Sequence, residues 1–147
     1  MQHGLKQSFI LSITTAIALL FVSCGESKVA QCNKIIKVAN QASTLGQEFG
    51  KNPNQSKGSK ALTELAQKID PLAQQMKALE IKDEKLQGFQ GRFLKLYQDI
   101  IKELNNAATA IDKKNSSAAK NSLVSLQKSG QEENSIVSEI NSYCSGK

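Results

Sequence analysis

Residues 86–111, LQGFQGRFLKLYQDIIKELNNAATAI, form the stretch of sequence that decides the fold. Its apolar residues recur at steps of three and four: Leu86, Phe89, Phe93, Tyr97, Ile100, Leu104, Ala107 and Ile111. This spacing places them along one face of an α-helix, and a mean step near 3.5 is typical of helices packed at small angles. The stretch therefore predicts one long amphipathic helix.

The same period occurs in three other stretches of the chain. The apolar positions are Cys32, Ile35, Ala39, Ala42, Leu45 and Phe49, then Leu62, Leu65, Ile69, Leu72, Met76 and Leu79, and finally Ala119, Leu123, Leu126, Gly130, Glu133, Val137, Ile140 and Cys144. No stretch shows the sustained alternation that is typical of a strand. Pro71 interrupts the second stretch, but the spacing stays in phase across it, so we predict one bent helix there.

Short polar connections separate the four predicted helices, at 50–58, 82–83 and 112–116. Ser59, Asp83 and either Asn115 or Ser116 are candidate N-caps for the helices that follow. Because short connections favour antiparallel neighbours, we predict an all-α fold, an up-down-up-down four-helix bundle over residues 32–147. The last two apolar stretches are longer than the first two, which predicts a step at one end of the bundle.

The first 23 residues have the pattern of a cleaved signal peptide. One lysine, Lys6, precedes an uncharged run whose apolar part, 9–22, has 14 residues. A membrane-spanning helix needs about 20 residues, whereas this length is typical of a signal-peptide core.

The run ends in Phe21-Val22-Ser23-Cys24, which resembles the lipobox of bacterial lipoproteins, with Phe21 where leucine is usual. The resemblance implies that Cys24 carries acyl chains such as palmitate, becomes the mature N-terminus and anchors the protein in a lipid bilayer. Residues 24–31 would then be a lipidated tether, and the protein would face the periplasm or the thylakoid lumen. The alternative is an ordinary secretory leader that is cut elsewhere, with Cys24 a free thiol.

The remaining cysteines, Cys32 and Cys144, lie on the apolar faces at the start of the first predicted helix and the end of the last. An up-down-up-down bundle brings these two ends together at one pole. With Cys24 acylated, Cys32 and Cys144 are the pair that can form a disulfide in an exported protein. The alternative is two separate buried thiols. The pairing would place this pole near the membrane.

The composition argues against several classes of function. The single histidine, His3, lies in the leader, so the mature chain lacks histidine bases and ligands. Because no carboxylates form a convincing pair, we expect no catalytic residue, no metal and no cofactor. Nucleic acid is also a poor partner, because the protein would be exported and no aromatic residue accompanies its lysines.

The net charge of the chain is +6, and the predicted topology gathers lysines at the pole opposite the disulfide. They are Lys57, Lys60, Lys113, Lys114 and Lys120, together with Lys51. Lys57, Lys60 and Lys120 lie near helix N-termini, where the helix dipole disfavours a cation. They are candidates for docking an acidic protein face or an anionic polymer. The alternative is an ordinary solvated surface.

The last predicted helix places Gly130 and Glu133 where its apolar face calls for bulk, and the first helix offers the small Ala42 at a similar height. Together the three residues predict a ligand groove between the first and fourth helices. In the alternative interpretation, the apolar face turns to Ile136 and Glu133 reaches solvent.

Arg92 is the only arginine, between Phe89 and Phe93, and we expect it to flank the core. This stretch and the closing residues 140–144 are similar to small helical lipoproteins of cyanobacteria, which implies no defined activity. The build is also similar to the lipid-anchored extrinsic subunits of photosystem II. We therefore expect a non-enzymatic accessory lipoprotein that presents its bundle to an exported partner. The alternative function is a small-ligand-binding lipoprotein.

Overall fold

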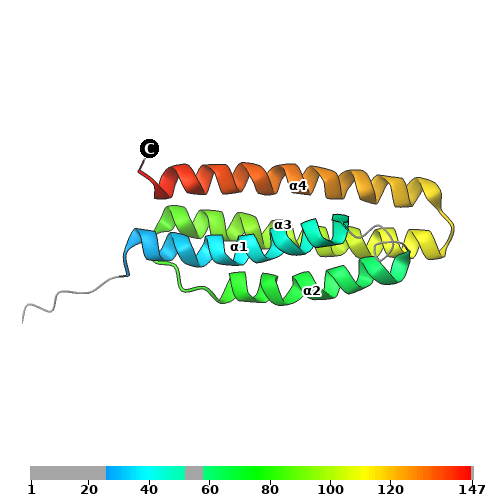
Figure 1. The fold of residues 1–147 in the computed structure, drawn as a ribbon, viewed down its shortest axis with the longest axis horizontal. Helices are drawn as coiled ribbons and strands as arrows, with labels where there is room; N and C mark the ends of the chain where they lie inside the picture. Colours follow the sequence, from blue (N-terminus) through cyan, green and yellow to red (C-terminus); the bar gives the residue numbers. More distant parts are fainter. Residues whose placement is uncertain (1–25, 52–57, 147) are drawn as a thin grey trace, which may run out of the picture.

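A computed structural model describes residues 26–51 and 58–146 of the chain. Within these ranges there are four α-helices and no strand: α1 (Lys28–Lys51), α2 (Ser59–Ala78), α3 (Glu84–Asp112) and α4 (Ser116–Cys144). Consecutive helices run in opposite directions along one long axis (Figure 1). The predicted all-α, up-down-up-down four-helix bundle is confirmed.

Helix α3 is the central element of the bundle. It packs along α2 on one side and α4 on the other, and these are the two most extensive interfaces between helices. Helix α1 contacts its neighbours less, and it ends well short of the far end of α3 and α4 (Figure 1). The lengths of 29 residues for α3 and α4, against 24 for α1 and 20 for α2, confirm the predicted step.

The core follows the predicted apolar faces of α2 and α3 closely. On α2 the buried residues include Leu62, Leu65, Ile69, Leu72 and Met76, and the helix continues unbroken through Pro71. On α3, Phe93 and Tyr97 are fully buried. Leu96, Ala108 and Ala110 are also buried, because a central helix with a neighbour on each side has a wider covered face.

Two large apolar side chains at predicted core positions are exposed instead. Ile111 is 39% exposed, because an α-helix of 3.6 residues per turn drifts away from a strict 3.5 repeat, and the buried face of α3 ends at Ala110. Leu123, in the first third of α4, is 51% exposed and lines a pocket between the helices together with Phe49 of α1. Further along α4, Ile136 and Ile140 are fully buried.

The helix ends confirm two of the expected caps and correct a third. The Asp83 carboxylate accepts a hydrogen bond from the Leu86 N–H, and the Asn115 side chain accepts one from the Ala118 N–H. Ser59, however, does not cap α2: it is the first residue of the helix, Gly58 is the N-cap, and no side chain caps this end. Gly58 has a φ of 94°, a left-handed conformation that glycine adopts without strain.

The expected tether, 24–31, is too long. Helix α1 begins at Lys28, where the Ser27 hydroxyl accepts a hydrogen bond from the Ala30 N–H. Gln31 is buried, and its side-chain oxygen accepts hydrogen bonds from the N–H groups of Lys82 and Asp83 at 2.6 and 3.1 Å. These contacts join the start of α1 to the α2–α3 connection, so residues 28–31 belong to the bundle.

A disulfide joins Cys32 of α1 to Cys144 of α4, with a Cα–Cα distance of 6.2 Å. The predicted pairing is confirmed, and we call this end of the bundle the disulfide pole. Polar contacts surround the disulfide there. The Tyr143 hydroxyl donates to Asp83 at 2.8 Å, and Arg92 forms two hydrogen bonds to Glu139 across α3 and α4, at 2.7 and 3.0 Å. Arg92 thus flanks the core in an ion pair.

Candidate functional site

The main candidate site is a pocket of about 540 Å³ between the helices, away from the disulfide pole. All four helices supply its walls, including Ala42 of α1, Leu65 of α2, Tyr97 of α3, and Gly130 and Glu133 of α4. The structure thus brings together the three residues from which the sequence predicted a groove. A pocket of this size, with mostly apolar walls, is typical of small-molecule sites.

The pocket remains open because small residues face it from α1 and α4. Gly46 and Gly130 both line it, and a Cβ atom added at either position would meet no neighbouring atom within 4 Å. Contact between α1 and α4 is also sparse. The middle of α4 is therefore not packed solidly against α1.

Two polar atoms of the pocket residues lack a hydrogen-bond partner among the described residues. They are the Tyr97 hydroxyl oxygen and Oε1 of Glu133, and both atoms are buried. Buried polar groups in folded proteins nearly always have a partner, so each orphan calls for an explanation such as a bound molecule. Tyr97 is 0% exposed, which makes its unpaired hydroxyl the more unusual of the two.

Burial dominates the electrostatics of this pair. It raises the pKa of the Glu133 carboxyl above its ordinary value. It also raises the pKa of the Tyr97 phenol, and the nearby Glu133 charge raises that pKa further. Burial is the main cause of both shifts, because among the described residues no hydrogen bond stabilises the charged form of the Tyr97 hydroxyl or of Glu133 Oε1.

Both interpretations of the middle of α4 are thus correct in part. Ile136 is fully buried, as the alternative predicted. Glu133, however, is only half-buried and keeps one carboxylate oxygen inside the pocket. Sequence reasoning missed Tyr97 as a site residue because its position fits the apolar face of α3. The hydroxyl of Tyr97 could have identified it as a site residue, because a buried tyrosine needs a hydrogen-bond partner for that group.

Two other hollows of the described surface are less suited to a specific ligand. A groove of about 780 Å³ runs along the outer face of α1, over residues such as Ile36, Asn40 and Leu45. A smaller one, of about 470 Å³, lies at the disulfide pole, where the Lys28 and Lys85 ammonium groups approach the Tyr143 ring at 4.4 and 4.6 Å. Neither hollow contains an unpaired buried polar atom of the described residues.

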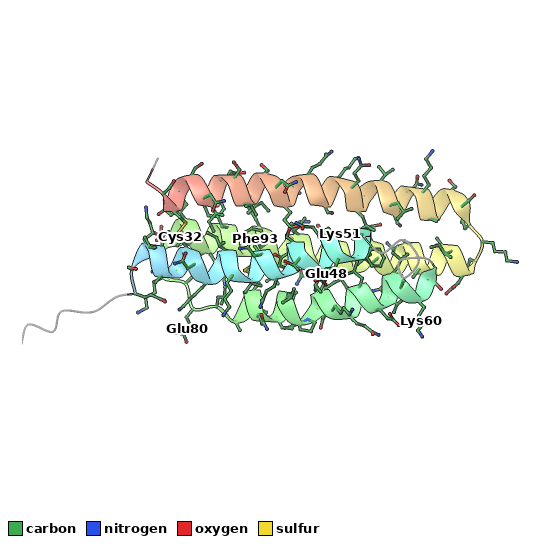
Figure 2. The ribbon with its side chains drawn as sticks, in the orientation of Figure 1. Cys32, Glu48, Lys51, Lys60, Glu80 and Phe93 are labelled. Carbon is green, nitrogen blue, oxygen red and sulfur yellow. A yellow bond between two sulfur atoms is a disulfide. The ribbon has the colours of Figure 1, made fainter. Side chains whose placement is uncertain are left out.

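Most of the lysines proposed for docking lie within the described residues. Lys57 and the lipidation residue Cys24 lie outside the described residues. Lys60 lies in the first turn of α2, opposite Cys32 along the bundle (Figure 2), and its Nζ is 3.8 Å from a Glu64 oxygen. Lys113, Lys114 and Lys120 are exposed around the α3–α4 turn. Helices α2 and α4 make no direct contact within the described ranges.

The comparisons with known proteins supply no family for this chain: no family model, no curated protein and no solved structure matches it. Over the described ranges, none of the helices is both long and apolar enough to cross a membrane. The same part of the chain contains no group of three or more His, Cys, Asp or Glu side chains placed to hold a metal ion.

Proposed function

We propose that this protein is an exported, lipid-anchored accessory protein without enzymatic activity, whose bundle binds a small, mostly apolar ligand between its helices. The observation that carries the proposal is the inter-helix pocket with its two unpaired polar atoms, on Tyr97 and Glu133. Apolar walls that face water and a buried hydroxyl without a partner both cost stability, and a bound ligand would offset both costs.

The location part of the proposal rests on the lipobox-like stretch that ends at Cys24. Acyl chains on this residue would anchor the chain only four residues before the start of α1. The disulfide pole would then lie near the bilayer. The pocket draws on the second half of α1 and the first half of α2, so it would lie in the part of the bundle farther from the lipid.

The proposal is tested by photolabelling of the acylated protein in lipid nanodiscs with a diazirine derivative of dodecanol. We expect the label on peptides that contain Leu65 or Leu126, which line the pocket. The Gly130→Leu variant fills the open space in the pocket and should abolish this labelling. Gly88→Leu is the matched control, because Gly88 is an exposed helical glycine away from the pocket. Equal labelling of both variants, or labelling elsewhere, would overturn the proposal.

Docking of an acidic protein face or an anionic polymer is a second proposal, supported by the exposure of the three lysines around the α3–α4 turn. Changing Lys113, Lys114 and Lys120 to glutamate should abolish retention on immobilised polyglutamate at moderate ionic strength. The control variant carries the same change at three exposed lysines elsewhere, Lys68, Lys77 and Lys128. Equal loss of retention in the two variants would show that only net charge matters.

A further inference from the structure

The polar groups in the inter-helix pocket limit the chemistry of the ligand, provided that the pocket binds one as proposed above. Of the described residues that line it, Glu133 and Tyr97 are the two that can ionise, and α1 and α2 contribute none. No lysine or arginine is among them. Among the described residues, the one ionisable group that faces Glu133 across the pocket is therefore the Tyr97 phenol on α3.

An anionic head group fits this lining poorly. A carboxylate or phosphate ligand would place a second negative charge beside Glu133, in a site where burial already disfavours the first. Coulomb repulsion between two negative charges is stronger at such a half-buried position than in bulk water. Since no lysine or arginine is among the described lining residues, a fatty acid or another anionic amphiphile should bind less well than a cationic one.

A cationic amine fits the same groups well. A primary ammonium group has three donors and no acceptor, so it has enough donors to pair with both Glu133 Oε1 and the Tyr97 hydroxyl oxygen. Its charge also compensates the Glu133 carboxylate, and hydrogen bonds between charged groups are the stronger kind. An alcohol could pair with both atoms as well, but it would leave the carboxylate charge uncompensated.

The rest of the pocket suits an apolar chain. Leu62, Leu65 and Ile69 of α2, Leu104 of α3 and Leu126 of α4 all line it. Most of these leucines and isoleucines are buried, so a hydrocarbon chain placed among them would be removed from water. We propose that the pocket binds an amphiphile with a primary amine head group, held by Glu133 and Tyr97, and an apolar body packed between α2, α3 and α4.

The test is competition against the dodecanol photolabel by dodecylamine, dodecanol and dodecanoate, with the full acylated protein in nanodiscs. At neutral pH dodecylamine should compete about tenfold better than dodecanol, and dodecanoate should compete least. The Glu133→Gln variant keeps the shape of the side chain and should reduce the amine preference to about twofold or less. Glu132→Gln is the matched control, because Glu132 is the exposed carboxylate next in sequence and does not line the pocket.

The pH dependence supplies a second measurement. The amine pairs with ionised Glu133, so its apparent affinity should rise as the pH increases through the titration of this carboxyl, while competition by dodecanol stays constant. Equal competition by amine and alcohol, or a preference that survives Glu133→Gln, would overturn the inference but leave the pocket as a binding site. Absence of specific labelling at the pocket would overturn the proposed function itself.

Discussion

Removal of the Cys32–Cys144 disulfide tests how the bundle holds α1. We consider the double variant Cys32→Ala/Cys144→Ala, which replaces the bond by two small apolar side chains. Helix α1 has the weakest contacts with the rest of the bundle, and the disulfide joins it directly to α4. Helix α1 is also one wall of the pocket. Loss of the bond should therefore affect both the stability of the fold and ligand binding.

The magnitude follows from the length of chain that the bond closes. The two cysteines are 112 residues apart, and closing a loop of this length constrains the unfolded chain by about 5 kcal/mol in the chain-entropy description. For a domain of this size, each kcal/mol shifts the unfolding midpoint by about 3–5 °C. The variant should therefore unfold about 15–25 °C below the wild type.

The assay is thermal unfolding of the acylated protein in detergent micelles, followed by circular dichroism at the helical bands. Ser142→Ala, an exposed change on the last turn of α4, serves as the control. Hydrogen exchange measured on the same samples should show that α1 loses protection before α2 and α3. A midpoint within about 5 °C of the wild type, or uniform loss of protection, would refute the role assigned to the disulfide.

Three further predictions concern the pocket and the helix ends. The pKa of Glu133 is raised in the folded state, so its ionisation should make the bundle less stable as the pH rises above about 4.5. Unfolding midpoints measured from pH 4 to 8 should therefore fall with pH, and Glu133→Gln should make this fall smaller. Gly46→Ala and Gly130→Ala should each stabilise the fold by about 0.5–1 kcal/mol, additively, in denaturant titrations, and a destabilising effect would contradict the open space beside them. Hydrogen bonds from the Leu86 N–H and the Tyr143 hydroxyl hold the pKa of Asp83 below its ordinary value. Asp83→Ala should therefore lower the unfolding midpoint at pH 7, and this loss should shrink as the pH falls through the titration of the Asp83 carboxyl. A loss that is independent of pH would disprove this role.

The architecture could be predicted from the sequence because α2 and α3 contain an almost unbroken apolar repeat. Their buried residues, such as Leu65, Met76 and Phe93, lie at the expected positions. The disulfide followed from topology, since the two cysteines lie at ends that the bundle must bring together. Asp83 and Asn115 were recognisable as caps because they directly precede the helices.

The sequence predictions that were wrong share one physical cause. An apolar repeat in one helix does not show which other element of the fold covers it. Leu123 fits the repeat of α4, but it faces the open pocket and is exposed. The start of α1 could not be located because Gln31, a polar residue, is buried through hydrogen bonds to a connection 51 residues away. The spacing of apolar residues within one segment does not predict hydrogen-bond partners that are distant in the sequence.

The candidate site was predicted in outline but not in its chemistry. The small residues Ala42 and Gly130 indicated a groove, and the sequence identified Glu133 as out of place. The partner of Glu133 in the site, Tyr97, is a regular member of the apolar face of α3. The sequence does not show that the Tyr97 hydroxyl is buried without a hydrogen-bond partner among the described residues, and this appears only in the structure.

A crystal structure of the protein grown with dodecylamine tests the central claim most directly. We predict density for the hydrocarbon chain in the inter-helix pocket, beside Leu65 and Leu126, with the amine nitrogen within hydrogen-bond distance of Glu133 Oε1 and the Tyr97 hydroxyl oxygen. A pocket that is filled by the protein's own side chains, or an amine bound only in the outer groove of α1, would contradict the claim.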